Sequence, residues 1–234
     1  MKSFVQHLSR YLFVGRDLNV FAVLDGASVR NLRASLHIMQ PDYACLYRGE
    51  LKPDLAESAP YLVRLQPDTK FTEWVVIDGW GKHWGVFLRS TKELPAIRRH
   101  LRGLLQVHDA DGRPLLFRFY DPRVLSVFLP TCNAEQLATF FGPVDSFLLE
   151  GPAADMLLRF RVIDGALKKE KRTLTTEIQE NLELEKAERE RLRRELLPTK
   201  EDERELSEDE LQHSLADFCT TVVKYSPPKK PEKE

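Results

Sequence analysis

The stretch NVFAVLDG at residues 19–26 is an apolar run that ends in an Asp-Gly pair. Continuous apolar runs of this length are typical of strands buried on both faces of a sheet, and Asp-Gly is a common turn pair. We therefore expect a buried strand here, with its exit turn directly after it. The chain of 234 residues is 42% hydrophobic, which suits one core of ordinary size with additional segments.

Strand-like and helix-like segments alternate on the C-terminal side of this run. Further strands are expected at YACLYRG (43–49), YLVRL (61–65) and WGVFLRS (84–90), and helices at residues 71–81 and 90–105. Residues 107–120 and 144–163 each resemble a hairpin of two strands. Alternating strands and helices favour parallel order, and hairpins add antiparallel edges. The predicted class is therefore α/β, with a mixed, partly parallel sheet, flanking helices and a helical C-terminal extension.

The composition changes near Asp164-Gly165, after which charged residues dominate. Residues 168–197 contain no Gly or Pro, which predicts one long helix. A final helix is predicted to carry one apolar stripe, which consists of Leu211, Leu215, Phe218 and Val222. We predict an α/β domain over residues 1–165, a charged helical region over 166–225 and a disordered tail over 226–234.

Charge and cysteine content exclude several classes of protein. The net charge is −1, from 35 Lys+Arg against 36 Asp+Glu, so neither nucleic acid nor an anionic membrane is the default partner. The three cysteines stand singly, which suits a reducing compartment and no zinc ribbon. Charged residues interrupt the apolar N-terminus, and no uncharged run is long enough to cross a bilayer. We expect a cytoplasmic protein.

The familiar catalytic motifs are missing from the sequence. It contains no nucleophile elbow, no P-loop, no HExxH and no dinucleotide fingerprint, and its six histidines lack metal-ligand spacing. The basic helix segment IRRHLRG begins at residue 97 and is interpreted as a solvated face, with nucleic-acid binding as the alternative. We expect no catalytic residue, no metal and no cofactor, and therefore not an enzyme.

Three charged residues, Arg118, Asp121 and Arg123, interrupt the apolar stretch FRFYDPRVLSVFLP at residues 117–130. Asp121 precedes a proline in the pattern of a helix N-cap, so its carboxylate can accept backbone N–H bonds and pair with Arg118 or Arg123. A catalytic aspartate normally has a second titratable group nearby, and only arginines are near in sequence. We interpret the three as a structural clamp that also presents Arg123 to a partner. The alternative is a small-ligand-binding or enzymatic domain with an Arg118/Arg123 anion site.

The segment GWGKHWG at residues 79–85 places Trp80 and Trp84 four positions apart between glycines. Large aromatic side chains are mostly buried, which favours a helix end and a tight turn with both rings in the core. Exposed, the same rings would be anchors for a protein partner.

A resemblance to a known family rests on an ordered set of segments rather than on one motif. The segments are FAVLDGA (21–27), YACLYRG (43–49), APYLVRL (59–65), GWGKHWGVFLRS (79–90), IRRHLRGLLQVHDADGRPLLFRFYDPRVLSVFLPTC (97–132) and LATFFGPV (137–144). Together they resemble the type VI secretion effector-adaptor family, the Tap/TEC-type chaperones. The resemblance covers about residues 20–150.

This resemblance implies a non-enzymatic bacterial cytoplasmic adaptor. Such a protein binds one toxic effector as its cargo and loads it onto the VgrG spike for delivery. The α/β body would be the shared platform, and the C-terminal helices would recognise the effector. The candidate partner-binding residues are Arg118, Asp121, Arg123, Trp80, Trp84, Leu211, Leu215, Phe218 and Val222.

Overall fold

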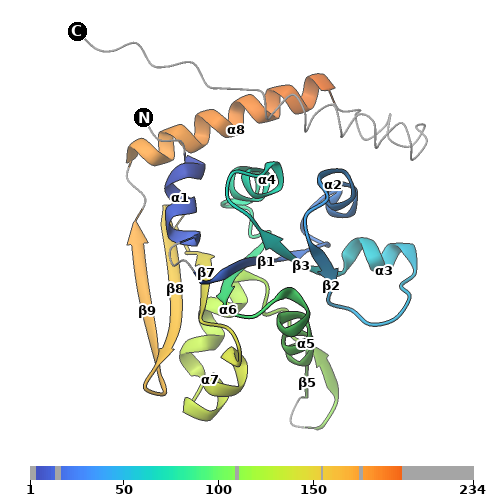
Figure 1. The fold of residues 1–234 in the computed structure, drawn as a ribbon, viewed down its shortest axis with the longest axis vertical. Helices are drawn as coiled ribbons and strands as arrows, with labels where there is room; N and C mark the ends of the chain where they lie inside the picture. The colour runs from blue at the N-terminus through green and yellow to red at the C-terminus, as the bar shows by residue number, and fades with distance from the viewer. Residues whose placement is uncertain (1–3, 14–16, 109–110, 154, 174–175, 197–234) are drawn as a thin grey trace.

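The computed structural model describes residues 4–13, 17–108, 111–153, 155–173 and 176–196 (Figure 1). The helices are α1 (Phe4–Leu12), α2 (Leu32–Met39), α3 (Pro53–Ser58), α4 (Lys70–Gly79), α5 (Leu94–Leu104), α6 (Pro122–Phe128), the 3-10 turn η1 (Leu129–Thr131), α7 (Ala134–Phe141) and α8 (Thr176–Leu196). The strands are β1 (Asn19–Asp25), β2 (Tyr43–Cys45), β3 (Pro60–Leu65), β4 (Gly85–Ser90), β5 (Gln106–His108), β6 (Pro114–Leu116), β7 (Ser146–Glu150), β8 (Met156–Ile163) and β9 (Ala166–Thr173).

Seven strands form the main sheet in the order β2-β3-β1-β4-β7-β8-β9, and β5 and β6 form a separate ribbon. Every strand pair in the described part of the chain is antiparallel. The predicted mixed, partly parallel sheet is therefore wrong, although the α/β class is correct.

The strand order explains why alternating strands and helices produced an antiparallel sheet. The connection through α2 joins β1 to β2, and the connection through α4 joins β3 to β4. Strands β1 and β2 run in the same direction but have β3 between them, while β3 and β4 have β1 between them. Each crossover thus leaves a gap that an antiparallel strand fills, which is the split β-α-β arrangement.

Helices cover both faces of the sheet and make three layers (Figure 1). One face packs against α1, α2 and α4 through side chains such as Leu8, Leu36 and Trp74. The other packs against α5, α6 and α7 through side chains such as Leu101 and Phe140. Strand β1 contributes Ala22 and neighbouring alternate residues to the first core, and Phe21 and Val23 to the second. This double burial explains its unbroken apolar sequence.

Residues 166–173 form β9 rather than the first turns of the predicted helix, so that prediction is wrong for this segment. Asp164 and Gly165 both have positive φ, 52° and 73°, and Ile163 pairs with Ala166 across the turn. A two-residue Asp-Gly loop with positive φ at both positions joins antiparallel strands tightly. The sheet therefore continues past the turn, and the following helix, α8, begins at Thr176.

The predicted Asp121 helix cap is confirmed, and a second cap begins α7. The Asp121 side chain accepts the backbone N–H of Arg123 at the start of α6, with Pro122 in the first turn. Asn133 and Gln136 form a reciprocal capping box at the start of α7. Among the described residues, none of the helices is long and apolar enough to cross a bilayer.

Candidate functional site

Arg118 is paired with Asp25, not with Asp121. Asp25 ends β1, is buried, and already accepts hydrogen bonds from the backbone N–H of Ala27 (3.1 Å) and the hydroxyl of Ser28 (2.8 Å). One guanidinium nitrogen of Arg118 donates to Oδ2 of Asp25, the same oxygen that accepts the Ser28 hydroxyl. The bond raises the pKa of Arg118, because the carboxylate favours the charged guanidinium. The exit turn of the central strand is thereby fixed to the segment before α6.

Asp121 is paired with Arg123, as one of the two predicted arrangements requires. Arg123 Nε lies 3.0 Å from Oδ1 of Asp121, and its terminal nitrogen lies 2.7 Å from Oδ2. Burial opposes the charge on Asp121, but the side-chain and backbone hydrogen bonds from Arg123 outweigh it and lower the pKa of the carboxyl. Both arginines of the alternative anion site therefore already have a carboxylate partner, and the structural clamp is the better interpretation.

Trp80 and Trp84 both lie in the core, with 2% and 7% of their surface exposed. Trp80 meets Phe4 edge-on at 5.7 Å between ring centroids, and Trp84 lies 4.9 Å from Trp74. Gly79 allows this packing, because a Cβ on it would lie 2.9 Å from the Trp84 ring. In this structure the packing alternative holds for both rings, and neither is exposed as an anchor.

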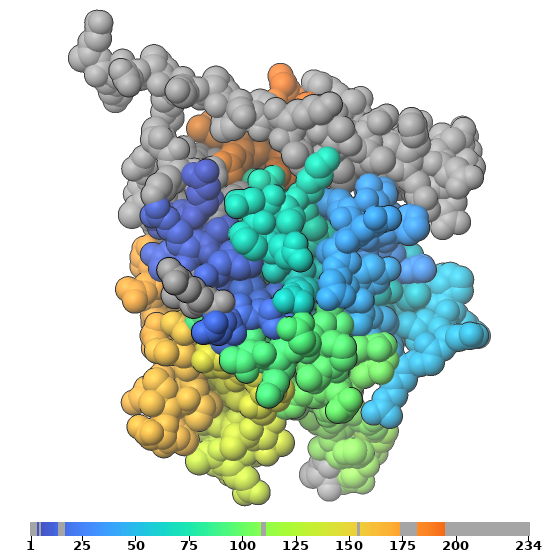
Figure 2. Space-filling model, in the orientation of Figure 1, coloured from blue at the N-terminus to red at the C-terminus, as the bar shows by residue number. Residues whose placement is uncertain are grey.

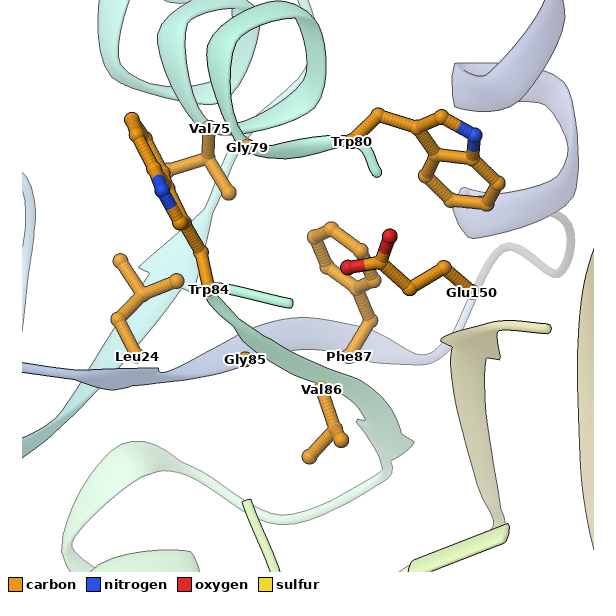
Figure 3. A pocket seen from close by; sticks show the side chains of 9 residues that line it. All are labelled: Leu24, Val75, Gly79, Trp80, Trp84, Gly85, Val86, Phe87 and Glu150. Carbon is orange, nitrogen blue, oxygen red and sulfur yellow. The ribbon is translucent and has the colours of Figure 1, made fainter. Parts of the chain in front are cut away.

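Glu150, at the end of β7, holds the turn between the two tryptophans (Figure 3). Its carboxylate accepts the backbone N–H of Gly81 at 2.6 Å and of His83 at 2.8 Å. Both residues have positive φ, 81° and 56°, so the turn needs an external acceptor to hold its amides. Burial raises the pKa of Glu150. A cavity of about 10 Å³ beside it has room for no more than about one water molecule.

Helix α8 lies beside α1 and α4 (Figure 1) and is attached to the body at this same turn. The ammonium of Lys186 donates to the Trp80 carbonyl at 2.7 Å, and Arg189 pairs with Asp78 of α4 at 2.9 Å. Leu182 and Leu192 are buried on the docked side of the helix. Apolar contacts and one buried ion pair therefore hold α8 against the body, where it lies over α1 and α4.

Two arginines of the basic face of α5 bond to backbone carbonyls, whereas Arg99 is exposed, so the interpretation as a solvated face is correct only in part. Arg98 donates to the carbonyl of Cys45 at 3.0 Å, and Arg102 donates to the carbonyls of Leu46 (3.0 Å) and Tyr47. His100 lies 2.8 Å from the carbonyl of Phe140. These side chains hold the end of β2 and the end of α7, so they are not arranged as a phosphate-binding stripe.

An arginine cluster on β4 and β8 has no counterpart in the sequence-based predictions. Arg89 is 1% exposed, and its Nε donates to the Ser146 hydroxyl at 2.9 Å. Burial and the nearby Arg159 lower the pKa of Arg89. Asp145 and Glu170 lie within ion-pair distance of the cluster and partly compensate its charge.

The predicted apolar stripe of the final helix lies outside the described residues; it consists of Leu211, Leu215, Phe218 and Val222. Within residues 4–196, apart from the gaps named above, no group of three His, Cys, Asp or Glu side chains is placed to hold a metal ion.

The sequence-based predictions missed the structural roles of Asp25 and Glu150. Both residues stand in the same pattern, an acid after an apolar strand and before glycine, which is VLDG in one case and LLEG in the other.

The fold and these contacts define a three-layer α/β protein whose buried charges hold turns and helix ends. The family described as "Domain of unknown function (DUF4123)" matches residues 20–139, half of the chain, and the chain belongs to this family. The family is associated with effector adaptors of the type VI secretion system. No curated protein and no solved structure matches the chain.

Proposed function

We propose that the protein is a non-enzymatic adaptor that binds a type VI secretion effector and loads it onto the VgrG spike. The observation that carries this proposal is the family match over residues 20–139. The match begins at the central strand β1 and ends in α7, so it covers most of the helices and strands that surround the core. Cytoplasmic location in a bacterium is part of the same proposal.

The arrangement of the charged side chains supports an adaptor over the alternative anion-binding enzyme. Arg118 and Arg123 are each paired with a separate carboxylate, so neither positive charge is left over for a substrate. Thermal-shift measurements with phosphorylated metabolites test this rival directly, because a ligand that binds the native state raises the melting temperature. A reproducible rise that Arg123→Ala removes would favour the enzyme.

We further propose that the cargo is recognised by the part of the chain that follows β9. Helix α8 lies outside the family match and presents exposed residues such as Leu184, which is 57% exposed, away from its docked side. This location of the cargo-binding part is tested by deleting residues 174–234, because that deletion leaves β9 in the sheet. The shortened protein should keep its fold and lose the effector.

The adaptor function is tested by a pull-down with tagged full-length protein from a native lysate, followed by mass spectrometry. Recovery of one large toxin-like protein together with a VgrG-type spike protein is the expected result. Recovery of neither, from a sample shown to be folded by circular dichroism, would contradict the proposal.

A further inference from the structure

A groove of about 440 Å³ lies between the segment after β2 and the junction of α5 and β5. One side is lined by Leu46, Tyr47 and Arg48, and the other by Arg102, Gly103, Leu105, Gln106 and His108. The volume is within the range of about 300–1,000 Å³ that is usual for ligand pockets. The ribbon β5–β6 and α5 lie at the end of the molecule opposite α8, so the groove is far from the docked helix (Figure 2).

Two arginines give the groove positive charge. Arg48 and Arg102 line it, and among the residues that the structure describes no Asp or Glu does. Arg102 is held in place by the carbonyls of Leu46 and Tyr47. Among the residues that the structure describes, no ion pair involves Arg48, Arg98 or Arg102. Burial, together with the guanidinium groups of Arg98 and Arg48, lowers the pKa of Arg102, which is consistent with an uncompensated cluster.

Apolar side chains also line the groove, and an exposed leucine lies on the neighbouring strand of the ribbon. Leu46 and Leu105 lie in its floor, 1% and 8% exposed. Leu116 pairs with Gln106 across the ribbon, so its side chain lies on the same face as that of Gln106, which lines the groove. Leu116 is 55% exposed. An exposed leucine near arginines that have no carboxylate partner among the described residues is typical of a site that receives both apolar and acidic groups.

We propose that this groove binds an extended acidic segment of a partner protein, whose carboxylates pair with Arg48 and Arg102 and whose apolar side chain covers Leu116. Charge complementarity selects an acidic occupant. A free phosphate or carboxylate would satisfy the arginines but leave Leu116 in water, whereas a peptide meets both requirements. The inference rests on the proposed function only in taking the partner to be a protein.

A phage-displayed library of random twelve-residue peptides tests the proposal on the full-length protein. The enriched peptides should carry Asp or Glu next to Leu or Phe. Synthetic versions should bind at least tenfold more weakly to Arg48→Glu, and several-fold more weakly to Leu116→Ser. Arg99→Glu is the matched control, because Arg99 is an exposed arginine of α5 that does not line the groove, and its binding should equal that of the unmodified protein.

Three results would overturn the proposal. The first is enrichment of no peptide, or only of peptides without acids. The second is equal binding to Arg48→Glu and Arg99→Glu. The third is displacement of the peptides by millimolar inorganic phosphate with no effect of Leu116→Ser, which would mean a simple anion site. The selection needs neither effector nor spike, so its failure leaves the adaptor function standing, and an empty pull-down leaves the groove standing.

Discussion

Arg118 and Asp25 form an ion pair across 93 positions of sequence, and the pair joins the end of the central strand to the segment before α6. Asp25 is 3% exposed at its side chain, whereas Arg118 is 44% exposed. Loss of the ion pair therefore costs more free energy at Asp25 than at Arg118, because a buried carboxylate without a cation is costly. The charged residues in the apolar stretch at 117–130 are consequently part of the framework of the fold.

Replacing Arg118 should destabilise the protein. Arg118→Ala leaves the buried Asp25 carboxylate without its cation, and we expect the free energy of unfolding to fall by about 1–3 kcal/mol. Urea denaturation measures the change. Arg113→Ala is the control, because Arg113 and its partner Asp111 are 72% and 74% exposed and such pairs contribute little. Equal effects of the two substitutions would contradict the clamp.

The pair of Asp121 and Arg123 should make stability depend on pH in the acid range. The folded-state pKa of Asp121 is below its ordinary value of 3.8, so its contribution is present above that pH and is lost as pH falls through the lower, folded value. Asp121→Asn keeps a cap but removes the charge. The unmodified protein should be more stable than the variant at pH 7, and the difference should shrink toward zero below about pH 3.8. A difference that is constant across pH would rule out this explanation.

The buried pair that attaches α8 should show strong coupling. The side chains of Arg189 and Asp78 are 9% and 14% exposed, and a double-mutant cycle with alanine should give an interaction energy of about 0.5–3 kcal/mol. The pair of Arg191 and Glu188 lies on the same helix, with Arg191 62% exposed, and should give about 0.5 kcal/mol or less. Hydrogen exchange in α8 should accelerate in Arg189→Ala. No coupling in the first cycle would show that Arg189 does not hold the helix.

Two glycines should respond in opposite directions to the same substitution. A Cβ on Gly85 would lie 2.0 Å from the carbonyl oxygen of Val23 in the central strand, so Gly85→Ala should cost about 3 kcal/mol through backbone displacement. Nothing lies within 4 Å of a Cβ on Gly103, in helix α5, and Gly103→Ala should stabilise by about 0.5–1 kcal/mol. Thermal unfolding distinguishes the two, and destabilisation by Gly103→Ala would be the unexpected result.

Local patterns predicted the elements better than their arrangement. The apolar run at residues 19–26 is indeed a strand buried on both faces, but such runs occur in any sheet that has helices on both sides, parallel or antiparallel. Direction depends on which strand fills the gap left by each crossover, and no local pattern contains that information. The Asp164-Gly165 pair did contain a signal for a hairpin, which the dense charge of residues 166–173 obscured.

In the candidate site too, contacts between neighbours in sequence were predictable, and contacts between distant residues were not. The Asp121 cap was predictable, because cap and helix are adjacent in sequence. The partner of Arg118 and the role of Glu150 depend on residues that are distant in sequence, so only the folded chain brings them together. Likewise, Arg98 and Arg102 form a basic helix face in the sequence, whereas in the structure they hold the end of β2.

The most direct test of the adaptor function compares VgrG purified from cells that contain this protein with VgrG from cells that lack it. If the protein loads the effector, the effector should co-purify with VgrG only when the protein is present, and supplying the protein again should restore the association. Co-purification of effector and VgrG to the same extent in both kinds of cell would contradict the adaptor function.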